Sequence, residues 1–137
     1  MSVEGASDWR DRQVSATEAV SLIQAGDKVF VGSACATPRA LVRALEELAR
    51  PGVELVHFLT NQTGAGDAPH TNYRHRVFYV GTDDRALLES SQVEYLPLSL
   101  ADAPRLFADG QLPLDVAMVQ VAPPDEDGTS ASGSPST

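Results

Sequence analysis

The chain has 137 residues, a formal net charge of −9 at pH 7 and a hydrophobic share of 42%, which suits one folded domain and hardly two. The negative net charge argues against nucleic acid and membrane surfaces as partners, because both are anionic and would repel the protein. The single cysteine excludes an intrachain disulfide. The polar N-terminus is unlike a secretory signal, and no apolar run approaches the length of a membrane span, so we expect a cytoplasmic protein.

Helical and strand-like patterns alternate along the chain. Residues 1–14 form a polar segment, and residues 15–128 form an α/β domain. The predicted helices combine apolar residues at helical spacing with start and stop signals, and they cover residues 15–26, 37–52, 82–92 and 99–111. The predicted strands are short apolar runs at residues 28–32, 53–59, 76–81, 93–98 and 114–121.

The expected helix starts rest on capping signals. Ser15 and Glu18 form a capping box, in which a hydroxyl accepts from a main-chain N–H of the first turn. Thr37 is the expected N-cap of the second helix, with Pro38 at its first position. A second capping box is expected from Ser99 to Asp102.

The strands are apolar throughout rather than alternating with polar residues. This pattern predicts a Rossmann-like parallel sheet with helices on both faces. Ligands of such sheets bind beyond the carboxyl ends of the strands. The segments to inspect are therefore "GSACATP", "TNQTGAGD", "GTDD", "PLSLAD" and "APPDED".

The segment "GSACATP" leads from a strand to a helix N-terminus, and its small residues would let a ligand approach main-chain N–H groups there. The alternative is an ordinary turn and cap. The segment is neither a dinucleotide-binding GxGxxG nor a P-loop. Cys35 is a candidate nucleophile in this position, or simply a small residue. The candidate substrate-binding residues are Gly32, Ser33, Ala34, Cys35, Ala36, Thr37 and Pro38.

Other residues of chemical interest have plainer interpretations. His57 lies in an apolar strand and is expected to be packed and hydrogen-bonded. His70 and His75 lie in or beside a long polar loop without further ligands at metal-binding spacing. The acidic run at residues 125–127 is typical of a solvated corner. We therefore predict no metal site and assign no catalytic residue.

Two blocks carry a resemblance to a known family. The first is "SATEAVSLIQAGDKVFVGSACATPRALVRAL", and the more specific second is "YLPLSLADAPRLFADGQLPLDVAMVQVAPPDEDG". Both resemble the acetyl-CoA hydrolase/transferase family, which includes 4-hydroxybutyrate and succinate CoA-transferases. The likeness spans residues 14–128. It departs at Ala34 and Ala36, where the family more often has glycine, and at Asp127, where the family has histidine.

The resemblance implies a NagB/CoA-transferase-like fold of two α/β domains with acyl-CoA in the cleft between them. The implied reaction passes through a thioester on a glutamate of the second domain. The implied ligands are a coenzyme A thioester, as substrate rather than permanent cofactor, and a small carboxylic acid. A homodimer is a further possibility. The chain alone, representing the N-terminal half without that glutamate, is expected to be inactive.

Residues 129–137 end the chain on "TSASGSPST", which has the composition of a disordered tail. Codons for residues 130–137 can also be chosen so that, read two nucleotides later, they encode Ser-Leu-Gly-Val-Ser-Val-Asp. This is the sequence with which members of the family continue at this point. A frameshifted reading and a flexible tail both stay open here. Two other interpretations of the chain stay open as well. It could be a stand-alone module that binds a CoA-like or phosphorylated ligand, or a non-functional gene fragment.

Overall fold

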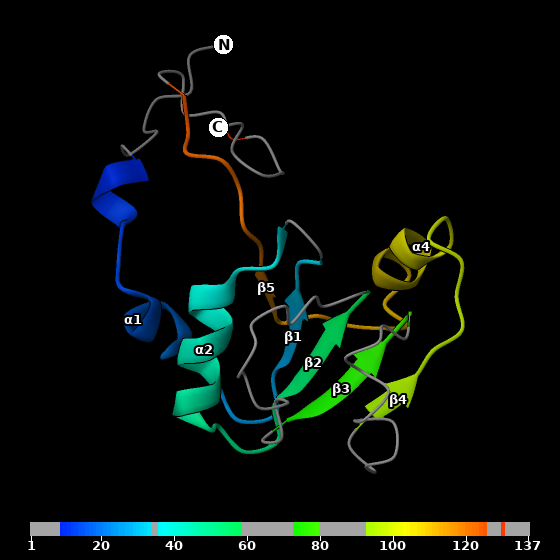
Figure 1. The fold of residues 1–137 in the computed structure, drawn as a ribbon. Coiled ribbons are helices and arrows are strands. Elements are labelled where there is room, and N and C mark those ends of the chain that lie inside the picture. The colour runs from blue at the N-terminus through cyan, green and yellow to red at the C-terminus, as the bar shows by residue number, and fades with distance from the viewer. Residues whose placement is uncertain (1–8, 34–35, 59–72, 80–92, 126–129, 131–137) are drawn as a thin grey trace, which may run out of the picture.

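A computed structural model of the protein describes residues 9–33, 36–58, 73–79, 93–125 and 130. Within them, five strands form one parallel sheet in the order β4-β3-β2-β1-β5 (Figure 1), which confirms the predicted α/β class. The strands are β1 Lys28–Val31, β2 Glu54–His57, β3 Arg74–Val77, β4 Val93–Tyr95 and β5 Val116–Met118. The helices are η1 Trp9–Arg12, α1 Ala16–Val20, α2 Arg39–Leu48 and α4 Ala103–Ala108. The helix expected over residues 82–92 lies outside the described residues.

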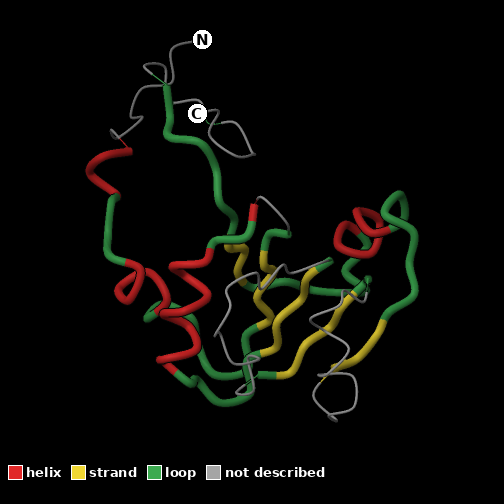
Figure 2. Tube along the Cα trace, in the orientation of Figure 1, coloured by secondary structure: helices red, strands yellow, loops and turns green. Residues whose placement is uncertain are grey.

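One face of the sheet packs against α1 and α2 (Figure 2). Val29, Val31 and Leu55 point to this face because side chains alternate along a strand. They form one buried cluster with Val20 of α1 and Leu45 of α2. Val29 and Leu45 are 0% and 1% exposed, so this layer is the main core and holds α2 against the sheet.

The opposite face packs against α4. Phe30 and Val56 point to this side, because each directly follows a strand residue, Val29 or Leu55, that belongs to the first cluster. The ring of Phe107 from α4 makes edge-to-face contacts with Phe30 at 6.0 Å and Phe78 at 6.4 Å between centroids. Aromatic pairs favour this geometry. Helices therefore cover both faces, as predicted.

The first helix begins as predicted but ends early. The Ser15 hydroxyl accepts from the N–H of Glu18 at 3.1 Å. After Val20 the main-chain bonds change to i→i−3 spacing, from Leu22 to Ala19 and from Ile23 to Val20. The predicted helical end at residue 26 is therefore wrong, because the apolar residues after Val20 occupy a tighter turn rather than a helix.

The last helix and the third strand also differ from their predicted bounds. Ser99 Oγ accepts from the N–H of Ala101 at 3.2 Å, and Asp102 caps α4 without a side-chain hydrogen bond. The expected Ser99–Asp102 capping box is wrong because the serine closes a local turn before the helix starts. The third strand begins at Arg74 rather than residue 76, since Arg74 and His75 pair with β2.

Candidate functional site

The strand order creates a switch point beside β1. The chain proceeds outward from β1 through β2 and β3 to β4, and then returns to place β5 on the other side of β1. Segments that follow β1 and β5 therefore leave the carboxyl ends of neighbouring strands. The connection after β1, through α2, lies on one face of the sheet, and the connection that leads into β5, through α4, lies on the other. In open α/β sheets, ligands bind in the crevice at such a point.

Main-chain hydrogen bonds join the segments after these two strands. The N–H of Gly32 donates to the carbonyl of Met118 at 2.8 Å, and the N–H of Gln120 donates to the carbonyl of Ala36 at 2.9 Å. A Cβ atom on Gly32 would collide with that same Ala36 carbonyl oxygen. Glycine is thus required at position 32 because the loop folds back directly over its Cα.

Ser33 ties the same loop to β2. Its hydroxyl Oγ accepts from the N–H of Phe58, the residue after β2, at 3.2 Å. The ring of Phe58 contacts Phe30 of β1 edge-to-face at 5.9 Å between centroids. The loop after β1 is therefore held from both neighbouring strands, and its described residues are pre-positioned rather than adaptable.

The start of α2 differs from the sequence-based expectation. The N-cap is Pro38 rather than Thr37, and no side chain caps the helix. The correction follows from the chain path, since the N–H of Arg39 donates back to the Thr37 carbonyl at 3.0 Å. Thr37 is 5% exposed, and its Oγ1 has no hydrogen-bond partner among the described residues.

Five of the seven predicted site residues can be located. Gly32, Thr37 and Pro38 are buried, whereas Ser33 and Ala36 are half-buried. The structure brings these five together in one loop between β1 and α2. Ala34 and Cys35, including the candidate nucleophile, lie outside the described residues.

Sequence reasoning missed the arrangement of the histidines. His57 is buried and hydrogen-bonded, as predicted, and its partner is His75. His75 is also buried, and it is the second residue of β3, the strand that follows the long polar segment. The local pattern carried no signal of this pair, because it depends on the β2–β3 register. His70 lies outside the described residues.

The remaining candidate groups form no second site among the residues that the structure describes. Asp125 is exposed, and residues 126–127 of the acidic run lie outside the described part of the chain. No group of three or more potential metal-ligating side chains occurs among the described residues. None of the described helices has the length and apolar character needed to span a membrane.

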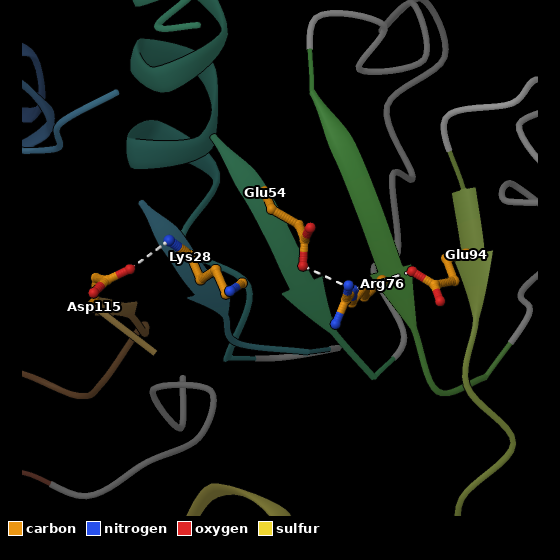
Figure 3. Close-up of polar contacts among 5 residues, drawn as sticks. All are labelled: Lys28, Glu54, Arg76, Glu94 and Asp115. Carbon is orange, nitrogen blue, oxygen red and sulfur yellow. Dashed lines mark hydrogen bonds and ion pairs between the residues drawn. The ribbon is translucent and has the colours of Figure 1, made fainter. Parts of the chain in front are cut away.

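A row of alternating charges crosses the sheet away from the loop (Figure 3). Arg76 of β3 lies between two carboxylates, with its Nε atom 2.8 Å from Glu54 and 3.1 Å from Glu94. Beyond Glu54, the main-chain N–H of Lys28 donates to Asp115 Oδ2 at 2.8 Å. Arg76 thus links β3 to both neighbouring strands, and Asp115 links the residue before β5 to the start of β1.

The sequence and the fold are similar to those of known proteins. The acetyl-CoA hydrolase/transferase N-terminal domain matches residues 2–136, and the chain belongs to this family. It is 32% identical over 124 residues to a 4-hydroxybutyrate coenzyme A transferase of Clostridium kluyveri, covering 88% of this chain and 29% of that protein. It is 26% identical over 115 residues to a succinyl-CoA:acetate/propanoyl-CoA:succinate CoA transferase of Fasciola hepatica, covering 81% of this chain and 24% of that protein.

Solved structures agree with this assignment. RipA from Yersinia pestis matches with a TM-score of 0.76 and 28% identity, covering 89% of this chain and 32% of that one. A 4-hydroxybutyrate CoA-transferase from Porphyromonas gingivalis matches with a TM-score of 0.60 and 32% identity, covering 88% and 27%. The chain thus spans about three-tenths of the length of the proteins it matches.

Proposed function

We propose that the chain supplies the N-terminal half-site of an acyl-CoA:carboxylate CoA-transferase or acetyl-CoA hydrolase. In this proposal the loop at residues 32–38 contacts the coenzyme A thioester or the small carboxylic acid that exchanges with it. Membership of the family and the position of this loop at the switch point support the proposal.

The chemistry requires a carboxylate nucleophile that attacks the thioester carbonyl and forms an acyl anhydride as the CoA thiolate leaves. In transfer, the thiolate then attacks the enzyme's carbonyl of that anhydride and releases the first acid, so that CoA can pass to a second carboxylate. In hydrolysis, water cleaves the anhydride instead. We assign that nucleophile to the part of the relatives that this chain does not match. The contribution of the present chain is then to bind and orient the substrate. Small residues and main-chain N–H groups at a helix start suit that task, because they can approach an anionic oxygen closely.

The observation that carries the proposal is the hydroxyl of Thr37. Buried polar groups in folded proteins are nearly always hydrogen-bonded, yet this one has no partner among the described residues. It stands directly before α2, a ten-residue helix that no side chain caps. A ligand oxygen at this helix start would give the hydroxyl a partner and would also benefit from the positive end of the helix dipole.

Calorimetric titration with coenzyme A and with acetyl-CoA tests this proposal. Thr37→Val removes the hydroxyl and keeps the side-chain shape, and we expect affinity to fall roughly fivefold, corresponding to about 1 kcal/mol. Thr37→Ser is the matched control, because it keeps a hydroxyl and should retain most of the affinity. Thermal unfolding of each variant verifies that the fold is intact.

Two outcomes contradict the half-site. One is the absence of any coenzyme A or acetyl-CoA binding by the parent chain at millimolar ligand. The other is equal affinity of the parent and Thr37→Val. Acyl transfer to acetate by the chain alone would instead refute the assignment of the nucleophile to the unmatched part of the relatives.

A further inference from the structure

Two arginines lie at the start of α2, directly after the loop of the proposed half-site. Arg39 is the first residue of the helix, and Arg43 lies about one turn further on. Residues four apart lie on the same face of a helix, and both arginines are exposed. The helix therefore presents two guanidinium groups on one face, in the turns that follow Thr37.

The charge order of α2 is the reverse of the order that stabilises a helix. Carboxylates are favourable at the positive N-terminal end of the helix dipole, and cations are favourable at the C-terminal end. α2 has no acidic residue in its first turn and no basic residue in its last turn, and its carboxylates, Glu46 and Glu47, lie in its C-terminal half. Arg39 and Arg43 also repel each other, since like charges at this spacing destabilise a helix. Neither effect stabilises α2, whereas a bound anion would be attracted by both arginines and by the helix start.

The hydroxyl of Thr37 is a second and independent sign of a ligand at this place. Thr37 is 5% exposed, and its Oγ1 atom has no hydrogen-bond partner among the described residues. The N-cap that follows is Pro38, and no side chain caps the helix. The start of α2 thus combines a buried hydroxyl that lacks an acceptor, an uncapped helix end and two exposed cations.

Phosphate is the anion that this combination suits. Guanidinium groups bind phosphate oxygens through paired hydrogen bonds, and helix N-termini bind phosphate through their main-chain N–H groups. Coenzyme A carries a diphosphate bridge and a 3′-phosphate. Because the chain has a formal net charge of −9, it would repel so anionic a ligand unless cations were gathered where the phosphates bind.

We propose that Thr37, Arg39 and Arg43 form a subsite for the phosphates of coenzyme A. The inference rests on the proposed function and names the part of the substrate that the start of α2 holds. The two guanidinium groups bind phosphate oxygens, and the Thr37 hydroxyl donates to one of them. The small carboxylic acid is the competing anion, but one guanidinium already matches a single carboxylate, whereas two exposed guanidinium groups fit a longer anion with several phosphates.

Binding of fragments of coenzyme A tests the inference. Calorimetry compares coenzyme A with pantetheine, which lacks the phosphates, and with sodium pyrophosphate. We expect coenzyme A to bind at least about tenfold more tightly than pantetheine, and pyrophosphate to compete with coenzyme A. Raising NaCl from about 50 to about 500 mM should weaken the binding of coenzyme A several-fold, because salt screens exposed charges, and should leave the binding of pantetheine unchanged.

Substitution of the two arginines gives a second measurement. Arg39→Gln and Arg43→Gln should each weaken coenzyme A binding about threefold, and together about tenfold, without changing the affinity for pantetheine. Arg105→Gln on α4 is the matched control, because Arg105 is also exposed and the net charge changes equally. It should leave the affinity for coenzyme A unchanged. Thermal unfolding of the double variant should be unchanged or slightly raised in temperature, since both arginines oppose the helix dipole.

Three outcomes overturn the subsite. These are equal affinity of the parent and the double variant for coenzyme A, equal affinity of the parent for coenzyme A and pantetheine, and binding of succinate rather than pyrophosphate that depends on the arginines. The two proposals fail separately. Coenzyme A binding that does not depend on the arginines retains the half-site and refutes the subsite. Arginine-dependent binding of pyrophosphate by a chain that does not bind coenzyme A retains the phosphate-binding residues and refutes the half-site.

Discussion

The Nε2 atom of His57 lies 3.2 Å from the Nδ1 atom of His75, although 18 residues separate the two in sequence. Each side chain is 3% exposed, and the rings meet edge-to-face at 89°. One ring must donate and the other accept, because a neutral imidazole has one N–H. The pair therefore links β2 to β3 through side chains as well as through the main chain.

A double-mutant cycle on this pair should show coupling. Replacing either histidine by leucine removes one partner of a buried hydrogen bond, and each single change should destabilise the fold by about 1–3 kcal/mol. The His57→Leu/His75→Leu double variant should lose less than the sum, with a coupling of about 0.5–1.5 kcal/mol. Urea unfolding at pH 7.5 measures these values, and strict additivity would show that the contact contributes nothing.

Tyr73 fastens the C-terminal end of α2. Its hydroxyl donates to the Leu45 carbonyl and accepts from the N–H of Arg50 at 3.0 Å. Ala49 between them adopts a left-handed conformation with φ of 47°. We expect Tyr73→Phe to destabilise the chain by about 1–3 kcal/mol, because a buried carbonyl and an N–H lose their partner.

The same residue predicts a dependence on alkaline pH. Burial, as the largest cause, raises the pKa of Tyr73 above its ordinary value of 10.0. Above pH 10 the unfolded chain releases this proton before the folded chain does, so the stability that Tyr73 contributes is present below pH 10 and declines as the pH rises further. The unfolding midpoint should therefore fall more steeply above pH 10 in the parent than in Tyr73→Phe. An equal decline of the unfolding midpoint above pH 10 in the two proteins would contradict this expectation.

Gly32→Ala should disturb the loop that carries the proposed half-site. The added Cβ would strike the carbonyl oxygen of Ala36, which accepts from Gln120. We expect a loss of about 1–3 kcal/mol in stability and weaker binding of coenzyme A in calorimetry. Gly110→Ala is the control, since its φ is +70° but its Cβ would meet open space. That change should cost about 1 kcal/mol and leave the affinity for coenzyme A unchanged.

The two carboxylates beside Arg76 should contribute unequally. The side chain of Glu54 is 15% exposed and that of Glu94 is 60% exposed. Arg76→Met should destabilise the chain by about 1–2 kcal/mol, because Glu54 loses its cation in a partly desolvated place. Glu94→Gln should change stability by less than about 0.5 kcal/mol. Urea unfolding in low and high salt tests this ranking, which equal effects of both substitutions would contradict.

Local patterns in the sequence predict much of this fold correctly. The Ser15 cap, the apolar strands and the position of the loop at residues 32–38 between a strand and a helix all follow from interactions among residues close in sequence. Such features can be predicted because capping, turns and burial depend on a few neighbouring side chains. The resemblance in two blocks also indicated the family without any structural information.

Tertiary structure alone decided which strands meet and in what register. Parallel strands are joined by crossovers, so no local signal states that His57 lies near His75 or that Arg76 lies between Glu54 and Glu94. The start of α2 changed for the same reason, since the loop before it bonds to Gln120 after β5. The loop residues were visible in the sequence, but their place at the switch point depends on how β5 returns to β1, because packing of the whole sheet determines that path.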